Sequence, residues 1–239
     1  MYQTIIEKNN NIFLEEENHT YTLLNSNIKF KSVTEFINTF FTPFDEEKIS
    51  QKLSGYGKYL NMSSQDILKE WEHRRTRGTL VHKEIENFIN TDCKIIDKDK
   101  LDLKSLQGIN FLKRKCISKD NYLFSEVKIY SEKLKLAGTI DLMLYNKKRN
   151  RIYLIDWKTN IEIKTKGYKK GIHPATNMID DCSFNRYNLQ LSLYQHMLEN
   201  YYNAHVDGLY ILHLKNYDYE IINCDFKKEY ISNMLQSTK

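Results

Sequence analysis

Two short segments constrain this chain most, because each places acidic or basic residues inside an apolar run typical of a β-strand. They are Gly138-Thr-Ile-Asp141 and Ile155-Asp156-Trp-Lys158, on either side of the polar stretch 146–150. If that stretch is a hairpin turn centred between residues 148 and 149, Asp141 faces Asp156, and Lys158 follows on the same face. Facing residues have Cβ atoms about 5 Å apart, where two like charges destabilise a sheet. The pattern therefore indicates a cation between the two carboxylates.

Asp156 has the surroundings of a strand that is buried on both faces, since apolar residues precede it and Trp157 follows it. Buried carboxylates are rare unless they are paired, hydrogen-bonded or bound to a metal ion. Carboxylate oxygens suit a hard ion such as Mg²⁺, which completes its shell with water and substrate phosphate. Two simpler interpretations stay open: the two aspartates are unrelated, or Lys158 is only a salt-bridge partner of one of them.

A helix is predicted over residues 77–89, because apolar residues recur at 81, 85, 88 and 89, with Gly78 near its start. His82 and Glu86 are four residues apart and share one face of this helix. A helical histidine is often a structural or surface residue, so its position upstream of the aspartates is what makes it a candidate.

A second helix is predicted over residues 187–198, with Leu189 among the residues of its apolar stripe. Gln190 and Tyr194 lie four apart on a neighbouring face. The simpler interpretation is a surface glutamine and a half-buried tyrosine.

Taken in order, four motifs resemble those of RecB-like nucleases of the PD-(D/E)XK superfamily. They are Gly-x-x-x-His-x-x-x-Glu at 78–86, Gly-Thr-Ile-Asp at 138–141, Asp-Trp-Lys-Thr at 156–159 and Gln-Leu-Ser-Leu-Tyr at 190–194. The resemblance covers roughly residues 78–198, and Ser32-Val-Thr-Glu-Phe36 resembles the segment that opens many such domains. The joint order of the motifs makes it specific. The second acidic position is Asp156 and not Glu, which the family commonly allows.

The resemblance implies an α/β (α+β) fold with a restriction-endonuclease-like core, in which helices flank a central mixed sheet. We expect one nuclease domain over residues 1–239, with an N-terminal hairpin and helical region over 1–77 and a catalytic core over 78–239. The hairpin is expected over 11–31, around residues 17–19, and Ser63 or Ser64 is expected to cap a helix. Central strands are predicted at 122–130, 134–145 and 151–159, and a loop at 164–181.

The resemblance also implies roles for the site residues. His82, Asp141 and Asp156 would be metal ligands, with the carbonyl oxygen of Trp157 a further one. Lys158 would position or deprotonate the attacking water and stabilise charge on the phosphate. Phosphodiester hydrolysis needs these functions, because a Lewis acid and a cation must neutralise developing negative charge. The cofactor is expected to be one or two Mg²⁺ or Mn²⁺ ions, since a nitrogen ligand suits Mn²⁺.

Four further residues are candidates for supporting roles in this interpretation. Glu86 would orient His82 or a metal-bound water. Gln190 and Tyr194 would contact the DNA near the scissile phosphate and brace the site. Glu126, on the strand before the aspartates, either joins the acidic cluster or pairs with a lysine, and both possibilities stay open.

Basic residues flank the proposed site on both sides, although the net charge of +5 is mild. We expect these to position phosphates, with solvated surface residues as the alternative. The residues are Arg74, Arg75, Arg77, Lys164, Lys166, Lys169 and Lys170.

Other features restrict the class of protein. No run of about 18 apolar residues is present, so a membrane span is not expected. The first eight residues lack the apolar segment of a signal peptide, so we expect a cytoplasmic protein. Four scattered cysteines without a Cys-x-x-Cys motif predict neither a disulfide framework nor an iron–sulfur cluster. Similarity to phage-encoded relatives agrees with a viral origin.

The sequence thus predicts a metal-dependent DNA nuclease. Similarity to stand-alone exonucleases favours one that acts on single-stranded ends in replication, recombination or repair. One alternative is a structure- or site-specific endonuclease of the same superfamily. Another is a non-catalytic nucleic-acid-binding subunit, which would have lost one of Asp141, Asp156 or Lys158.

Overall fold

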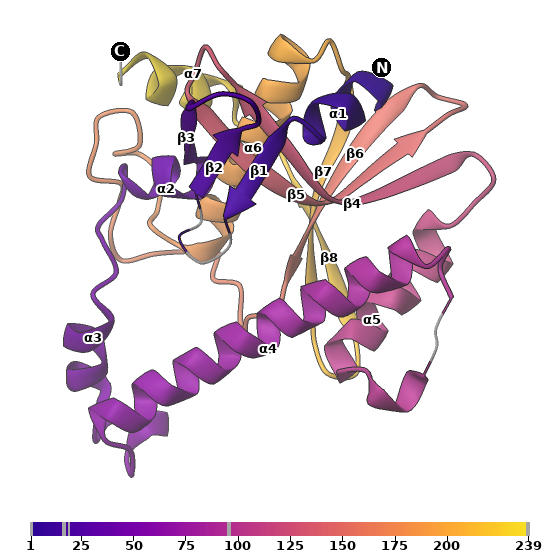
Figure 1. Ribbon diagram of the computed structural model, residues 1–239. Helices are drawn as coiled ribbons and strands as arrows, with labels where there is room; N and C mark the ends of the chain where they lie inside the picture. Colours follow the sequence, from indigo (N-terminus) through magenta and orange to yellow (C-terminus); the bar gives the residue numbers. More distant parts are fainter. Residues whose placement is uncertain (1, 16–17, 19, 95–96, 238–239) are drawn as a thin grey trace.

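A mixed β-sheet forms the centre of the computed structural model, which describes residues 2–15, 18, 20–94 and 97–237 (Figure 1). Within these residues the sheet has eight strands, in the order β1-β2-β3-β5-β6-β7-β8, with β4 also paired to β5. The strands are β1 (Ile12–Glu15), β2 (Thr20–Leu23), β3 (Lys29–Ser32), β4 (Asn121–Ser131), β5 (Leu136–Asn146), β6 (Arg151–Lys158), β7 (Val206–Leu214) and β8 (Tyr219–Cys224).

The helices are placed before, between and after these strands. They are α1 (Tyr2–Asn9), α2 (Val33–Asn38), α3 (Glu46–Leu53), α4 (Ser64–Asn90), α5 (Leu103–Phe111), α6 (Ser183–Tyr201) and α7 (Lys228–Gln236). The expected α+β class, with helices flanking a mixed sheet, is therefore confirmed. The sheet is mixed because β3 runs parallel to β5 and β6 parallel to β7, whereas the other pairs are antiparallel.

The hairpin of β5 and β6 has the register predicted from its polar turn. Leu142 pairs with Ile155, and Asn146 pairs with Arg151, so the hairpin is centred between residues 148 and 149. The pairing of β5 with β6 ends at Leu142 and Ile155, and β5 extends back to residues 136–137, where it pairs with β3 instead. The sheet therefore divides at Asp141, and this fork is the place where polar groups can enter an otherwise apolar sheet.

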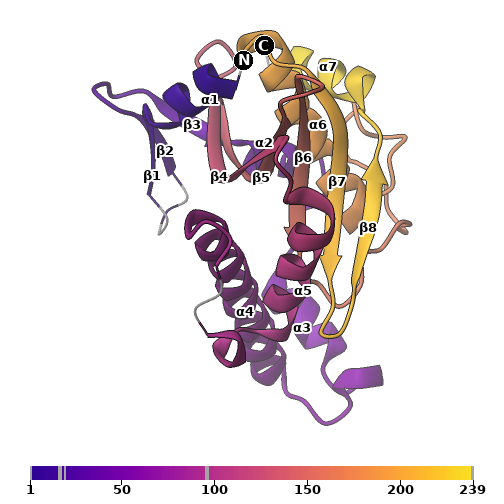
Figure 2. The ribbon, with the colours of Figure 1, turned by 90° about the vertical axis from the view of Figure 1, so that its right-hand side faces the viewer.

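Two apolar layers cover the faces of the sheet. Helices α1, α2, α6 and α7 pack on one face, over residues such as Met143 and Leu154. Helices α4 and α5 pack on the other, over Leu142, Ile155 and Trp157. Figure 2 shows α4 and α5 on the side of β6 and β7 that is opposite to α6 and α7. Successive side chains of β5 and β6 point to opposite faces of the sheet, so these strands contribute apolar residues to both cores.

Helix α4 is longer than the sequence pattern suggested, because the helix predicted from residue 77 is continuous with the one that begins near Ser63. Ser63 accepts a hydrogen bond from the N–H of Asp66, whose side chain accepts one from the N–H of Ser63, so the pair forms a capping box. Gly78 lies inside the helix and not at its start. The N-terminal half of α4 extends beyond the sheet with α3 beside it (Figure 1).

The N-terminal hairpin is confirmed as β1, β2 and β3, although residues 17 and 19 of its expected turn lie outside the described residues. The loop between β6 and α6 is also confirmed, over residues 159–182. Among the described residues, no helix combines the length and apolar character needed to cross a bilayer.

Candidate active site

The fork between β5 and β6 brings Asp141 against the backbone of β6. The N–H of Trp157 donates to Oδ2 of Asp141 at 2.8 Å. This side chain satisfies a backbone donor of β6 beyond Leu142 and Ile155, the last paired residues of β5 and β6. The bond fixes the carboxylate next to Asp156, as the predicted register requires, and it places the backbone of Trp157 beside Asp141.

Asp156 and Lys158 form a buried ion pair on β6. Nζ of Lys158 is 2.6 Å from Oδ2 of Asp156, and only 3 % of Asp156 is exposed. Burial raises the pKa of Asp156 to about 6 despite the opposing charge of Lys158. Burial would lower the pKa of Lys158, but the carboxylates of Asp156 and Asp141 outweigh it and raise that pKa. At neutral pH the pair therefore holds a carboxylate and an ammonium group.

The ring of Tyr187, on α6, fixes the lysine from another side. Nζ of Lys158 lies 4.4 Å from the centre of this ring, within the range of a cation–π contact. The hydroxyl of Tyr187 donates to Oδ1 of Asn160 at 3.1 Å. Because both partners are themselves held, the ammonium group is preorganised.

Helix α4 places His82 beside the Asp141 carboxylate. Nδ1 of His82 is 3.7 Å from Oδ2 of Asp141 and 4.0 Å from Oε1 of Glu126. His82, Glu126 and Asp141 each offer a ligand atom, and these atoms all lie within 4.8 Å of one another. One nitrogen and two carboxylate oxygens at this spacing suit a divalent ion such as Mg²⁺ or Mn²⁺.

Glu126 is the residue that the sequence left open, and the structure joins it to the acidic cluster. It interrupts the ladder between β4 and β5 opposite Asp141, with a φ of 49°. A non-glycine residue in this region is strained by about 1–3 kcal/mol, and such strain often occurs at functional sites. Burial, followed by the charges of Asp141 and Glu86, raises the pKa of Glu126 to about 9. A bound cation would offset the repulsion between these carboxylates.

Glu86 lies one helical turn beyond His82, but it is not one of the three clustered ligand atoms. Its carboxylate is 2.9 Å from Nζ of Lys83. Its charge nevertheless contributes to the raised pKa of Glu126, so the residue lies beside the cluster. This position agrees with a residue that acts on the ligands and does not bind the ion itself. The orientation of His82 by Glu86 stays a prediction.

Gln190 and Tyr194 are brought together on α6. Nε2 of Gln190 donates to the hydroxyl of Tyr194 at 3.1 Å, and Tyr194 is buried. The Tyr194 ring lies so close to Gly138 that a Cβ atom there would be 2.5 Å from the ring. The glycine of Gly138-Thr-Ile-Asp141 therefore permits the contact between α6 and β5. Burial raises the pKa of Tyr194, and its phenol stays neutral.

Tyr21 was missed by the sequence analysis. Its hydroxyl is 2.9 Å from Oγ1 of Thr139, two residues before Asp141. Burial, together with the charges of Glu126 and Asp141, raises its pKa. No local pattern in the N-terminal hairpin signals this contact, because it depends on how the hairpin packs on β5.

The three arginines proposed to bind DNA each have a carboxylate partner within the protein. Arg74 pairs with Glu70, and Arg75 lies 2.6 Å from Glu72 and 2.7 Å from Glu46. The guanidinium of Arg77 donates twice to Asp102, at 2.6 and 2.9 Å. These contacts give the arginines a structural function between α3, α4 and α5, and their DNA contacts stay predictions.

The four lysines all lie on the exposed surface of the 159–182 loop. Lys170 pairs with Asp180 at 2.7 Å. Within the described part of the chain, no carboxylate lies within ion-pair distance of Lys164, Lys166 or Lys169. These three lysines are therefore available to an external anion.

Comparison with known proteins adds no assignment. No family model matches the chain, and no curated protein matches it.

Proposed function

We propose that this protein is a divalent-metal-dependent deoxyribonuclease that hydrolyses phosphodiester bonds, with the restriction-endonuclease-like core of the RecB-like nucleases. One observation carries the proposal: the ligand atoms of His82, Glu126 and Asp141 lie within 4.8 Å of one another, beside the buried Asp156–Lys158 pair. The element order supports it, since α4 is followed by the antiparallel strands β4 to β6, by α6, and by β7 parallel to β6.

His82, Glu126 and Asp141 would hold the ion, and the donor set fits it. Burial raises the pKa of Glu126, and the facing charge of Asp141 raises it further. A cation at this point would relieve that repulsion. Asp156 and the carbonyl oxygen of Trp157 are the next candidates along β6. When bound, Mg²⁺ or Mn²⁺ would polarise the phosphate and lower the pKa of a bound water.

Lys158 stabilises negative charge on the phosphate in this proposal. Its raised pKa keeps the ammonium group protonated, so it donates hydrogen bonds and does not deprotonate water. Its position is fixed by Asp156 and by the ring of Tyr187. A fixed cation in a buried site stabilises developing charge better than a mobile one, because no reorganisation is needed.

Asp156 is the group that can accept a proton from the attacking water. With a pKa of about 6, it is ionised at neutral pH but binds a proton readily. Gln190 and Tyr194 act as positioning residues, since their hydrogen bond orients the Tyr194 ring, and that ring packs against Gly138 of β5.

The favoured activity is that of an exonuclease that acts on single-stranded ends. Its function would lie in replication, recombination or repair. This choice derives from the resemblance to stand-alone RecB-like exonucleases. A structure- or site-specific endonuclease of the same superfamily is the alternative outcome of the test below.

The test uses DNA labelled at its 5′ or 3′ end, in linear single-stranded, linear double-stranded and closed circular forms, with Mg²⁺, Mn²⁺ or EDTA. We expect metal-dependent loss of linear DNA, and the label gives the polarity. Asp141→Asn should lower the rate at least 100-fold, because it removes the charge of a metal ligand. Asparagine keeps an acceptor for the Trp157 N–H, so the strand geometry should be retained.

The matched control is Asp225→Asn, which removes a carboxylate that is 94 % exposed and should leave the rate unchanged. Cutting of circles would change the assignment to an endonuclease. If the wild-type protein binds DNA and cuts nothing with either ion, the proposed activity is wrong and a non-catalytic binding role replaces it.

A further inference from the structure

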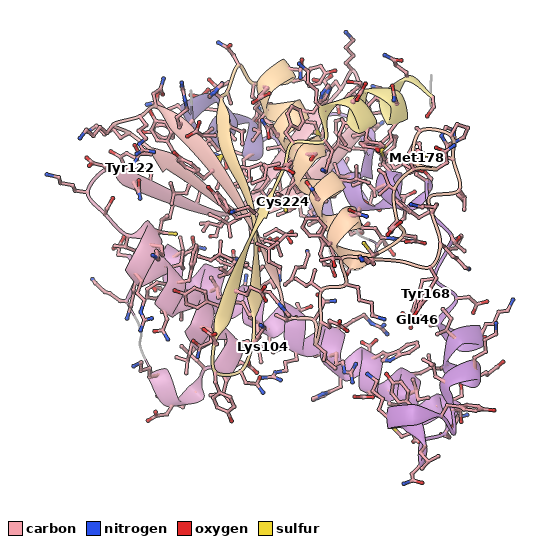
Figure 3. The ribbon with its side chains drawn as sticks, turned by 180° about the vertical axis from the view of Figure 1, so that it is seen from behind. Glu46, Lys104, Tyr122, Tyr168, Met178 and Cys224 are labelled. Carbon is pink, nitrogen blue, oxygen red and sulfur yellow. The ribbon has the colours of Figure 1, made fainter. Side chains whose placement is uncertain are left out.

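Tyr168 is fully exposed on the 159–182 loop, with a relative accessibility of 108 %. Figure 3 shows it at the edge of the molecule, projecting from the loop on the side where Glu46 of α3 lies. Exposed apolar residues are common singly. Aromatic rings together with basic residues are the groups with which proteins bind single-stranded nucleic acid.

The backbone on both sides of Tyr168 is fixed although its ring is free. The N–H of Asp181 donates to the carbonyl oxygen of Lys169 at 2.7 Å, and the N–H of Gly167 donates to Oδ2 of Asp180 at 3.4 Å. A Cβ atom on Gly167 would lie 2.3 Å from the carbonyl oxygen of Asp181, so this close approach requires glycine. The loop thus presents the ring at a defined place without burying it.

The charges around the ring favour a polyanion. Lys164, Lys166 and Lys169 are exposed and have no ion-pair partner in the described part of the chain. The nearby carboxylates of Asp180 and Asp181 are engaged by Lys170 and Arg186, both at 2.7 Å. Glu162 is the acidic residue that remains on the first part of the loop.

The loop is continuous with the proposed active site at both ends. It begins directly after Lys158, and it ends at α6, which carries Tyr187 over the Lys158 ammonium group. Lys164 is tied to the start of α6, because its N–H donates to Oγ of Ser183 at 2.8 Å and its carbonyl oxygen accepts from the N–H of Phe184 at 3.0 Å. The loop that carries Tyr168 is therefore joined to β6, which carries Lys158, and to α6, which carries Tyr187.

We propose that Tyr168 is a stacking platform for a base of single-stranded nucleic acid, with Lys166 and Lys169 on the adjoining phosphates. Single strands are bound in this way because every base has a flat π-face, whereas the bases of a duplex are stacked on one another. The inference rests on the proposed function, since it names the form of substrate that the nuclease engages.

The test measures binding by fluorescence anisotropy in EDTA, so that no cleavage occurs. Three labelled 20-mers serve as probes: oligo(dT), oligo(U), and an abasic DNA strand with the same phosphates but no bases. The wild-type protein should bind oligo(dT) about tenfold more tightly than the abasic strand. Tyr168→Ala should remove this difference, Tyr168→Phe should retain it, and Lys166→Ala with Lys169→Ala should weaken binding to all three probes.

The matched control is Tyr217→Ala, which removes a tyrosine that is 84 % exposed on the turn between β7 and β8 and should change nothing. A preference of the wild-type protein for oligo(dT) over oligo(U), also lost in Tyr168→Ala, would assign the platform to DNA. Equal binding of both probes would keep the stacking role and extend it to RNA.

Two results would overturn the inference. One is equal affinity of the wild-type protein for oligo(dT) and the abasic strand, and the other is a base preference that Tyr168→Ala leaves intact. If the protein cleaves DNA and either result is found, only the stacking role fails. If base-dependent binding is found without cleavage by any metal, the nuclease proposal fails and the platform stands.

Discussion

Asp141 accepts a hydrogen bond from the backbone N–H of Trp157 at the point where β5 and β6 separate. The same oxygen, Oδ2, is the one that lies 3.7 Å from Nδ1 of His82. One carboxylate therefore closes the fork in the sheet and joins helix α4 to the site. This dual position explains how residues from both faces of a buried sheet meet at one place.

The raised pKa of Glu126 predicts how the stability of the metal-free protein depends on pH. Between about pH 4.5 and 9 the folded protein binds more protons at Glu126 than the unfolded chain does, so the free energy of unfolding falls as pH rises. Asp156 contributes with the same sign below about pH 6. Urea unfolding in EDTA at pH 6 and pH 8.5 should show lower stability at the higher pH.

Glu126→Gln is the control for this pH dependence, since glutamine keeps the shape and cannot titrate. The stability of this variant should change less between the two pH values. Without EDTA, added Mg²⁺ should raise the free energy of unfolding of the wild-type protein at pH 8.5. An identical loss in the wild-type and variant proteins would show that Glu126 is not the group responsible.

Lys158→Met should destabilise the protein by about 3 kcal/mol at pH 8, because it leaves the Asp156 carboxylate buried without its cation. The loss should be smaller at pH 5, where Asp156 can bind a proton. The double variant Asp156→Asn with Lys158→Met should recover most of the stability. Chemical unfolding of these two variants and of Asp156→Asn alone measures the coupling, and additive effects would contradict a paired role.

Gly138→Ala should cost about 1–3 kcal/mol in the free energy of unfolding, because the new Cβ atom would lie 2.5 Å from the ring of Tyr194. Gly78→Ala is the matched control. There the nearest atom is the flexible Oγ1 of Thr159 at 3.1 Å, and alanine favours the interior of α4 by about 1 kcal/mol. Equal losses in both variants would argue against the contact between α6 and β5 as the cause.

Arg77→Ala should lower the free energy of unfolding by about 1 kcal/mol, since Arg77 donates twice to Asp102, the N-cap of α5. Arg77→Lys should recover part of this loss, because lysine keeps the charge but not the forked geometry. Thermal unfolding compares the three proteins. A large loss of DNA affinity without a change in stability would instead support the direct DNA contact expected from the sequence.

Local pattern was sufficient to predict the elements that the structure confirms. The polar turn at 146–150 predicted the register of β5 and β6. A helix cap was expected at Ser63 or Ser64, and Ser63 is the N-cap of α4. Both signals are short in range, since a turn fixes a hairpin and a cap fixes a helix end. The proximity of His82 to Asp141 was expected only from the order of motifs.

Features that depend on long-range packing were not predicted. Helix α1 has no capping signal in its sequence, and its Tyr2 ring packs against Phe124 and Tyr145 of the sheet. The positive φ of Glu126 accompanies a break in the β4–β5 ladder opposite Asp141, which no strand pattern reveals. The arginines before His82 were read as a DNA surface because their carboxylate partners lie partly on other helices.

The most direct measurement is a titration with Mn²⁺, in which the electron paramagnetic resonance signal of free Mn²⁺ reports binding. It compares the wild-type protein with the Asp141→Asn, Glu126→Gln and Asp225→Asn variants. We expect one or two bound ions in the wild-type and Asp225→Asn proteins. Binding should be at least tenfold weaker when Asp141 or Glu126 loses its charge. Absence of binding to the wild-type protein, or equal binding by all four proteins, would contradict a metal site at the fork.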